Sequence, residues 1–406
     1  MAITIGIIGA GASGMAAAIE AARTNPDAAV TIYEKLPIVG KKLLVTGNGR
    51  CNILNRDPKP EMYYGDVSFA EQAIRACDVE SHIHFFEQMG LHLYTEELGR
   101  LYPMSDQAAS VQDAFRNELK RLGIRVIQEK ITRVSRAENG FLLNDRYACD
   151  ALIVAGGGKA TPAQGSDGSC YPILRSLDVP VTTLSQALTG IKLSKPEARL
   201  KGVRASGRIL IVSDERVLAE STGEIQYADY GISGIPVMEV SRCVAMHYAE
   251  QKRSKIFAVI DSLPDFKQEQ TAAYLNFMIE HDPELTADFL LSGVMNKKLG
   301  IHKLSLCGID MQTTLSALCA NDVANLVEAI HAELCEISGT MGFDRSQVTA
   351  GGADPSRFDP LTMQSKDTPR LFVCGELLNV DGRCGGYNLT WAFTSGRLAG
   401  KAAALC

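Results

Sequence analysis

The chain has 406 residues, a formal net charge of −6 and a hydrophobic fraction of 46%. These values are typical of a globular protein of two or three domains, and the acidic balance gives no general attraction to nucleic acid or to an anionic membrane. The eleven cysteines include no Cys-x-x-Cys pair, which favours a reducing cytoplasm. Neither a signal peptide nor a transmembrane run of about 18 apolar residues is expected.

An apolar strand, a glycine-rich turn, a helix of small residues and a second strand follow one another between Ile5 and Glu34. The turn carries Gly9, Gly11 and Gly14, and the second strand ends on an acid 20 positions beyond Gly14. This order predicts a βαβ unit that binds a dinucleotide. We expect Gly9 to allow the tight turn, Gly11 to let the backbone approach a pyrophosphate, and Gly14 to let helix and strand pack closely.

The helix after this turn, which begins near Ala12 and Ser13, offers N–H groups and the positive end of its dipole to phosphate. Glu34 is expected to accept hydrogen bonds from both ribose hydroxyls. A carboxylate at this position disfavours a bound 2′-phosphate, so the pattern indicates FAD or NAD rather than NADP.

Further along the chain, glycine, asparagine and threonine predict a loop over residues 35–55. Apolar spacing predicts helices over residues 68–90 and 106–122. A buried strand over residues 151–154 then ends on Ala155, Gly156 and Gly157, a second glycine signature of the kind that meets a ligand at the edge of a parallel sheet.

From about residue 190 the pattern changes to short alternating runs, which predict antiparallel strands, and then to mostly helical segments. The α/β pattern returns with a buried strand that ends on Gly375 and Glu376. We therefore expect a discontinuous nucleotide domain, residues 1–190 and 345–406, and an inserted substrate domain, residues 191–344.

The C-terminal strand and helix favour FAD over NAD, because FAD is long and binds extended. The N-terminus of the last helix is expected to point at the flavin N1/O2 edge, where it stabilises negative charge. Gly385 and Gly386 are expected to let the backbone pass close to the flat ring, and Asn388 is expected to cap the helix.

Loop residues 47–52 are expected to fold over the flavin, with Arg50 and Asn52 as ligand contacts or as a structural clamp. Cys51 is either a redox thiol or, as we favour, a small buried side chain. Lys41 and Lys42 either neutralise a pyrophosphate or form a solvated pair. The histidines at 82, 84 and 92 are expected to be structural or exposed, not metal ligands.

The motifs Gly47-Asn48-Gly49-Arg50-Cys51-Asn52, Gly231-Ile232-Ser233-Gly234, Val348-Thr349-Ala350-Gly351-Gly352 and Gly385-Gly386-Tyr387-Asn388 span nearly the whole chain. In them the sequence resembles the BaiN-like flavoproteins, a family of NAD(P)/FAD-dependent oxidoreductases with aminoacetone oxidase among its relatives. The resemblance implies a glutathione-reductase-like FAD-binding Rossmann domain. It also implies an inserted β-barrel, at about residues 191–255, and a helical part, at about residues 265–335.

By the same resemblance, the residues that touch FAD would be Ser13, Glu34, Lys42, Ile131 (through its backbone), Asp381, Asn388 and Leu389. The glycine signatures and the loop add the following candidates: Gly9, Gly11, Ala12, Gly14, Lys35, Lys41, Gly47, Asn48, Gly49, Arg50, Cys51, Asn52, Ala155, Gly156, Gly157, Gly375, Glu376, Gly386 and Tyr387. The candidate catalytic residues are Tyr387 and Tyr230, as proton donors, and Arg50.

These patterns favour a cytoplasmic FAD oxidoreductase with non-covalent cofactor and a small-molecule substrate, and with neither nucleic acid nor membrane as partner. By family analogy it reduces an activated C=C bond of a hydrophobic carbonyl compound, such as a steroid or bile-acid enone. NAD(P)H would bind transiently or not at all, because no second complete fingerprint is present. The alternatives are an amine oxidase resembling aminoacetone oxidase and a non-catalytic flavin-binding protein.

Overall fold

The computed structural model describes residues 2–250 and 254–406, which form two compact units. One unit comprises Met1–Ser185 and Gln347–Cys406, and the other comprises Gln186–Ser346. Each unit has buried hydrophobic clusters of its own. Within the described ranges, no helix has the length and apolar character needed to cross a membrane.

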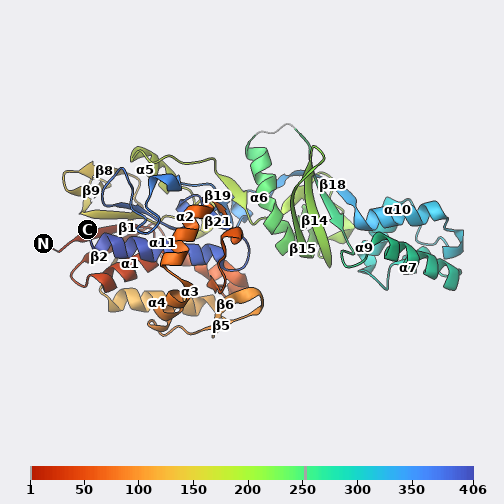
Figure 1. The fold of residues 1–406 in the computed structure, drawn as a ribbon, viewed down its shortest axis with the longest axis horizontal. Helices are drawn as coiled ribbons and strands as arrows, with labels where there is room; N and C mark the ends of the chain where they lie inside the picture. The colour runs from red at the N-terminus through yellow and green to blue at the C-terminus, as the bar shows by residue number, and fades with distance from the viewer. Residues whose placement is uncertain (1, 251–253) are drawn as a thin grey trace. The chain divides into compact units, whose positions relative to one another are not determined.

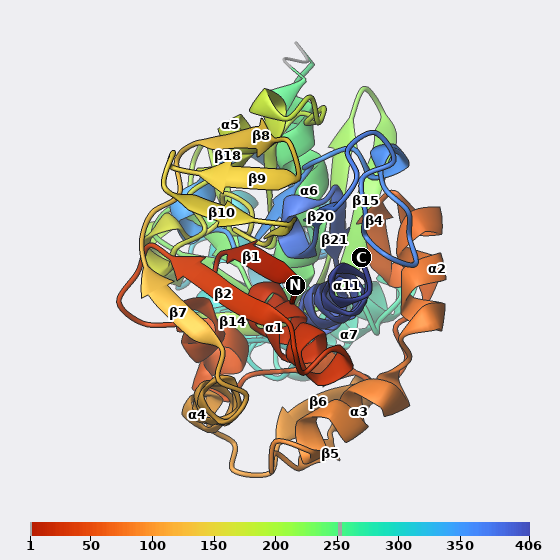
Figure 2. The ribbon, with the colours of Figure 1, turned by 90° about the vertical axis from the view of Figure 1, so that its left-hand side faces the viewer.

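A parallel sheet of five strands organises the first unit (Figure 2). Its strand order is β20-β11-β1-β2-β7, so β1 lies at the centre between β11 and β2. Four of the strands are short and mostly apolar because both faces of the sheet are covered, whereas the edge strand β7 is largely exposed. Their bounds are β1 (Thr4–Ile8), β2 (Ala29–Glu34), β7 (Arg125–Gln128), β11 (Ala151–Val154) and β20 (Leu371–Val373).

Helices α1 (Ala12–Thr24) and α11 (Tyr387–Ala404) pack against each other on one face of this sheet (Figure 2). A Cβ atom on Gly396 would lie 2.3 Å from Ser13 O, and one on Gly400 would lie 2.1 Å from Ala17 O. From the first contact to the second, both helices advance by four residues toward their C-termini, so the helices run parallel. Helix α11 begins nine residues before Gly396, so its N-terminus extends about 13 Å beyond the level of Ser13.

The segment expected as one helix over 68–90 is two helices, α2 (Val67–Ala76) and α3 (Val79–Glu87). The break arises because Asp78 caps α3 by accepting a hydrogen bond from Ser81 N at 2.8 Å.

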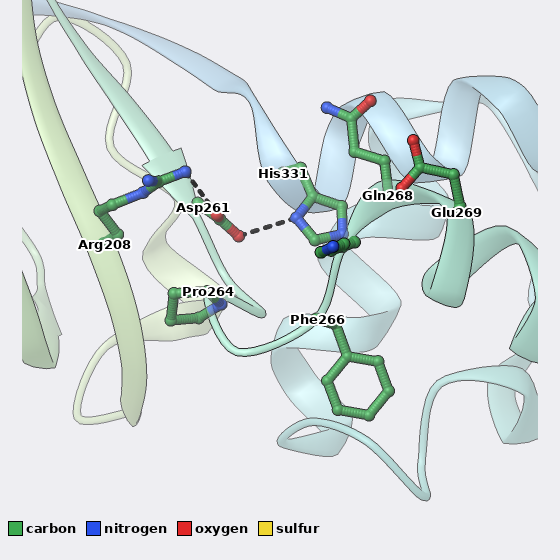
Figure 3. Close-up of a pocket in the computed structure, with 8 residues that line it drawn as sticks. Arg208, Asp261, Pro264, Phe266, Gln268, Glu269 and His331 are labelled. Carbon is green, nitrogen blue, oxygen red and sulfur yellow. Dashed lines mark hydrogen bonds and ion pairs between the residues drawn. The ribbon is translucent and has the colours of Figure 1, made fainter.

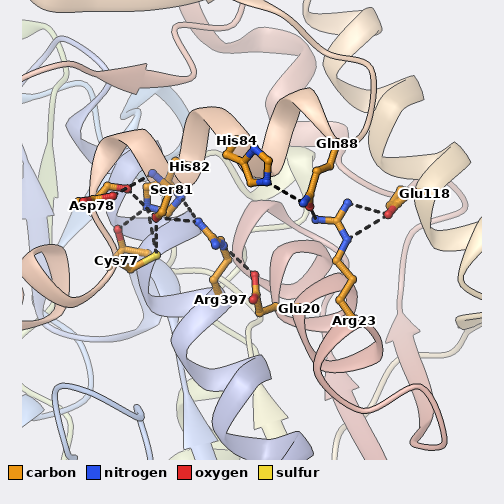
Figure 4. A network of polar contacts seen from close by, with 11 residues as sticks. Glu20, Arg23, Cys77, Asp78, Ser81, His82, His84, Gln88, Glu118 and Arg397 are labelled. Atoms are coloured by element: carbon orange, nitrogen blue, oxygen red, sulfur yellow. Dashed lines mark hydrogen bonds and ion pairs between the residues drawn. The ribbon is translucent and has the colours of Figure 1, made fainter.

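A buried polar network then ties α3 to α11 (Figure 4). In it His82 Nε2 lies 2.9 Å from Thr394 Oγ1, and Arg397 Nη1 lies 3.2 Å from His82 Nδ1. Burial and the Arg397 charge lower the pKa of His82 to about 3, so its ring is neutral.

The remaining elements of the first unit are small. The other helices are α4 (Ala108–Arg121) and α5 (Cys170–Ser176), with the 3₁₀ turns η1 (Lys41–Gly49), η2 (Pro60–Met62), η3 (Glu97–Gly99), η4 (Pro162–Gln164), η8 (Pro355–Arg357) and η9 (Gly375–Leu377). The other strands are β3 (Leu54–Asn55), β4 (Tyr63–Gly65), β5 (Leu93–Thr95), β6 (Arg100–Pro103), β8 (Val134–Ala137), β9 (Gly140–Leu143), β10 (Tyr147–Cys149), β19 (Val348–Ala350) and β21 (Val380–Gly382), with β12 (Ser185–Ala187) at the border.

The second unit is a closed antiparallel barrel with a helical part (Figure 1). The barrel order is β13 (Ile191–Leu193), β16 (Gly231–Ser233), β15 (Arg216–Ala228), β14 (Arg204–Ser213), β17 (Ile256–Asp261) and β18 (Glu333–Thr340). Its helices are α6 (Ile235–Ala249), α7 (Gln268–His281), α8 (Ala287–Leu290), α9 (Lys297–Leu306) and α10 (Ala320–His331), with the turns η5 (Ala198–Leu200), η6 (Leu315–Ala317) and η7 (Phe343–Arg345).

The barrel extends beyond the expected range of about 191–255. Strand β17 pairs with β14, and β18 pairs with both β17 and β13, so these two strands close the barrel. The helices α7 to α10 are therefore inserted between two neighbouring barrel strands. With the parallel sheet of the first unit, this architecture confirms the expected fold class.

Candidate functional site

The five parallel strands bring their carboxyl ends to one edge of the sheet, where ligands bind in open α/β folds. The fingerprint turn follows β1, and Glu34 ends β2. Ile131, which is 4% exposed, lies three residues beyond β7, beside the end of β2. The second glycine signature follows β11, and Gly375 follows β20. The fold thus collects signatures from distant parts of the chain at one place.

The three fingerprint glycines have different surroundings. Gly9 has a φ of +102°, and a Cβ atom there would lie 2.6 Å from Ala155 O. A Cβ on Gly14 would lie 2.0 Å from Gly9 O, so Gly14 serves the packing of helix on turn. At Gly11, by contrast, no atom of the described chain lies within 4 Å of a Cβ position. Open space in front of the central glycine is what a pyrophosphate that approaches the backbone requires.

Two further features fit a dinucleotide at this turn. Gly11 is the N-cap of α1, and within the described chain no side chain caps that helix, which leaves its N-terminus to an anion. Glu34 is 9% exposed, and its carboxylate accepts hydrogen bonds from Ala10 N at 2.6 Å and Leu36 N at 2.9 Å. These bonds fix the carboxylate beside the turn and leave each oxygen a lone pair for a ribose hydroxyl.

The lysines proposed as cofactor contacts all have protein partners. Lys35 Nζ lies 2.5 Å from Asp167 Oδ1, and Lys41 Nζ donates to Ala163 O at 2.9 Å. Lys42 Nζ lies 2.9 Å from Glu376 Oε2 and also donates to Ala160 O at 3.2 Å. All of these partners follow β11 or β20. The lysines therefore link the segment after β2 to neighbouring segments at the same sheet edge.

The glycines after β11 and β20 are explained by close contacts within the protein. A Cβ on Gly156 would lie 2.1 Å from Cys170 Sγ, and one on Gly375 would lie 2.5 Å from Ser13 Oγ. Gly157 has a φ of +71°. The next residue after Gly375, Glu376, accepts a hydrogen bond from Thr349 N at 2.9 Å.

Loop 47–52 has an unusual backbone, with positive φ at Gly47, Asn48, Gly49 and Cys51. Its Arg50 side chain does not extend free into a site. The guanidinium lies 2.5 Å from Glu96 Oε1 and 2.9 Å from Asp106 Oδ1, and 4.2 Å from the ring centre of Tyr102. These partners make Arg50 an anchor of the loop, as in the structural-clamp alternative.

The next two residues of the loop are held from the other side. Cys51 is fully buried, and this burial raises the pKa of its thiol to about 11. The thiol is therefore protonated at neutral pH, which supports a small buried side chain over a redox thiol. The Asn52 amide, oriented to satisfy its neighbours, donates to Leu54 O and Leu101 O and accepts from Gly386 N at 3.1 Å. Asn52 thus connects the loop to the start of α11.

The expected cap of α11 was wrong. The N-cap is Gly386, and Asn388 lies inside the helix with its Oδ1 accepting from Gly382 N at 2.8 Å and its Nδ2 donating to Gly382 O at 2.7 Å. A Cβ on Gly386, whose φ is +95°, would lie 2.4 Å from Leu54 O. A protein contact therefore requires glycine at position 386.

The other candidates near this helix are mostly buried. Asp381 is 2% exposed and Tyr387 is 8% exposed, and Leu389 is partly buried against the core. The Tyr387 ring packs edge-on against Tyr63, with 6.0 Å between the ring centres. Tyr230 belongs to the other unit, where its hydroxyl lies 2.6 Å from a Cβ position on Gly190.

A pocket of about 330 Å³ lies in the second unit, between β17 and the start of α7 (Figure 3). At its wall His331 Nδ1 lies 3.0 Å from Asp261 Oδ1, and His331 Nε2 lies 2.8 Å from Thr271 Oγ1. This order resembles a nucleophile–histidine–carboxylate triad. Thr271, however, is only 1% exposed and lies inside α7, so the contacts link helices to barrel and present no nucleophile to a substrate.

Sequence reasoning missed the partners that hold the candidate residues. Asp167 and Ser169 both contact Lys35, and Thr349 Oγ1 accepts hydrogen bonds from Lys159 N at 2.7 Å and Ala160 N at 3.0 Å. The position of Asp167, shortly after a glycine-ended parallel strand, was the available signal. Its partner could not be inferred from sequence, because 116 residues lie between Glu34, the end of β2, and Ala151, the start of β11. In the sheet, only β1 lies between these two strands.

Comparisons with known proteins match the chain over nearly its whole length. A family model described as "HI0933-like protein Rossmann domain" matches residues 3–402. The chain is 39% identical over 406 residues to a 3-dehydro-bile acid delta(4,6)-reductase of Clostridium scindens, covering 98% of both chains. It is 27% identical over 399 residues to a ribosomal RNA dihydrouridine synthase of Haemophilus influenzae, covering 96% of this chain and 95% of that protein.

Among solved structures, the 3-ketosteroid delta1-dehydrogenase from Sterolibacterium denitrificans, crystallised with 1,4-androstadiene-3,17-dione, has a TM-score of 0.52 to this chain. The two chains are 11% identical, and the alignment covers 99% of each. At this identity the likeness shows a shared fold.

Proposed function

The chain belongs to the HI0933-like Rossmann-domain family and is an FAD-dependent oxidoreductase, and from this premise we propose that it reduces a C=C bond conjugated to a carbonyl group in a hydrophobic substrate. The observation that carries the proposal is the 39% identity, over 98% of both chains, to a 3-dehydro-bile acid delta(4,6)-reductase. The substrate class is accordingly a 3-oxo steroid or bile-acid enone.

A second relative supports the reaction class by its name. Dihydrouridine is uridine with the ring C=C bond saturated, and that bond is also conjugated to a carbonyl. Both relatives, at 39% and 27% identity, are thus named for chemistry at such a bond. This agreement favours C=C reduction over amine oxidation, and it makes uridine in RNA the second candidate substrate.

In this proposal the chain's own residues bind and orient the cofactor. The turn at Gly11 and the N-terminus of α1 hold the pyrophosphate, and Glu34 accepts from the ribose. When bound, FAD supplies hydride transfer. Helix α11, which starts about 13 Å beyond the level of Ser13, would direct its positive dipole end toward the flavin N1/O2 edge. Tyr387 and Tyr230 are the proposed proton donors to substrate carbon.

We further propose that FAD is bound non-covalently and that NAD(P)H is the electron donor. Both can be tested with the purified holoprotein. Acid precipitation should release the flavin into the supernatant. Under anaerobic conditions NADH or NADPH should reduce the flavin, and a 3-oxo-Δ4 steroid should then reoxidise it.

Other acceptors in the same experiment separate the alternatives. Aminoacetone, added to the oxidised protein, should leave the flavin oxidised, and uridine-containing RNA should reoxidise reduced flavin slowly or not at all. Rapid reoxidation by RNA with no response to any enone would transfer the proposal to the second candidate substrate. Reduction by aminoacetone would refute C=C reduction in favour of amine oxidation.

A further inference from the structure

One short segment crosses the carboxyl edge of the parallel sheet. It runs over residues 159–169, after β11, and includes the turn η4. In the sheet, β11 and β2 lie on opposite sides of β1, whose carboxyl end carries the phosphate turn. The segment nevertheless contacts the residues that follow β2. It therefore spans the end of β1, a distance of two strand spacings or about 10 Å.

The base of this segment is closed and anchored. Gly168 N donates to Gly158 O at 2.9 Å, which joins the two ends of the segment, as in a compact surface loop. Thr349 Oγ1 accepts from Lys159 N and Ala160 N and so fixes the start. Positive φ values at Thr161 and Gly165 let the backbone turn between base and tip. The base is thus part of the first unit's framework.

Two lysines of the segment after β2 donate hydrogen bonds to the backbone of residues 159–169. Lys41 Nζ donates to Ala163 O at 2.9 Å, and Lys42 Nζ donates to Ala160 O at 3.2 Å. A Cβ on Gly165 would lie 2.9 Å from Leu36 Cδ1, which shows how closely the two segments pack. From sequence, Lys41 and Lys42 were either pyrophosphate contacts or a solvated pair; in the structure both contact residues 159–169, and Lys42 also contacts Glu376.

Asp167 is the charged centre of this contact. It lies 2.5 Å from Lys35 Nζ, accepts from Ser169 N at 3.0 Å, and lies 3.9 Å from Lys130 Nζ, beyond β7. Burial alone would raise the pKa of Asp167, but hydrogen bonds from Lys35 and Ser169 lower it to about 2, so the carboxylate is ionised. The Lys35 and Asp167 side chains are only 18% and 30% exposed, which weakens screening of the pair by salt.

We propose that residues 159–169 form a strap across the phosphate side of the cofactor site, and that Asp167 is the positioning residue that keeps this strap closed and so sets how slowly FAD leaves. The inference rests on the proposed binding of FAD at the carboxyl edge of the parallel sheet. It does not depend on which substrate the enzyme reduces. A dinucleotide held by Glu34 and by the turn at Gly11 would pass the carboxyl end of β1, which the strap also spans, so the Asp167–Lys35 pair would have to separate before the cofactor could leave in that direction.

The test is the rate of FAD dissociation from holoprotein, measured without substrate or electron donor by transfer to an excess of an apoflavoprotein trap. Asp167→Asn should release FAD about tenfold faster, and Asp167→Glu should restore a rate near that of the wild type. The matched control is Asp113→Asn, which removes a surface ion pair with Arg116 (3.4 Å, side chains 62% and 61% exposed) and should leave the rate unchanged. Because no turnover is measured, failure here is separate from failure of the proposed reaction.

Two further readouts distinguish a strap from other roles of Asp167. A strap requires Lys35→Met to accelerate release like Asp167→Asn, and the double variant to be no faster than either single variant. Additive effects would instead mean that Asp167 contacts FAD independently of Lys35, and would overturn the proposal. An unchanged rate of FAD release in Asp167→Asn would also overturn it.

Discussion

The most direct test of the cofactor site compares an alanine at Gly11 with an alanine at Gly14. At Gly11 the backbone has φ −79° and no atom in the described part of the chain lies within 4 Å of the new Cβ, so the apoprotein can accept the methyl group without strain. Loss of glycine freedom in the unfolded chain would even add about 0.4–1 kcal/mol of stability. At Gly14 the new Cβ would lie 2.0 Å from Gly9 O, and the turn must shift.

The two variants should therefore fail in different ways. Gly11→Ala places its methyl group where the pyrophosphate meets the backbone, and it should lose at least one charge-assisted hydrogen bond of about 1.5–3 kcal/mol. FAD affinity should then fall about 10- to 100-fold, with the apoprotein as stable as wild type. Gly14→Ala should lower the free energy of unfolding of the apoprotein by about 1–3 kcal/mol, because overpacking against backbone forces a main-chain shift.

Both quantities can be measured on the same samples. FAD affinity follows from fluorescence quenching when FAD is titrated into apoprotein, and stability follows from urea unfolding of the apoprotein. The reasoning is refuted if Gly11→Ala binds FAD with wild-type affinity, or if it destabilises the apoprotein as much as Gly14→Ala does.

Two further predictions concern charge. Glu34→Gln should lower FAD affinity about tenfold or more in the same titration, because an amide offers the ribose one acceptor oxygen in place of a carboxylate; an affinity like that of the wild type would exclude Glu34 as the ribose acid. His82 is neutral in the folded protein, with its pKa lowered to about 3, whereas the unfolded chain takes up a proton near its ordinary value of 6.5. Stability should therefore fall as the pH drops from about 7 to about 4, by about 3 kcal/mol from this residue. Over this pH range the free energy of unfolding, measured with urea, should fall less in His82→Gln than in the control His84→Gln, whose histidine is exposed. Equal falls in the two variants would contradict a buried neutral ring at His82.

The local pattern of the chain was enough to predict its cofactor class. Gly9, Gly11, Gly14 and Glu34 lie within one βαβ unit, so their relation depends on a short stretch whose geometry is set by strand, turn and helix propensity alone. The motif resemblance likewise gave the family, which the match over residues 3–402 confirms. The parallel sheet and the barrel-containing fold class were also predictable.

The cap of α11 was predicted wrongly, and the contact that requires Gly386 could not be predicted because it involves distant backbone. An asparagine after two glycines is a reasonable cap by local rules, but Asn388 bonds Gly382 instead. Gly386 is needed because Leu54 lies against it, more than 300 positions earlier in the sequence. The break between α2 and α3 at Asp78 is local, but apolar spacing continues across it and conceals it.

The partners of the charged residues were decided only by the tertiary structure. Lysines at 35, 41 and 42 follow a dinucleotide fingerprint, and their sequence position alone favours a role with phosphate. The order of strands places the segment after β11 across the end of β1, within reach of these lysines, and so gives Lys35 the partner Asp167. A sequence fixes which side chains are charged and which turns bind anions through short-range geometry. Which charges meet depends on strand order, and strand order is set by long-range packing of the whole sheet.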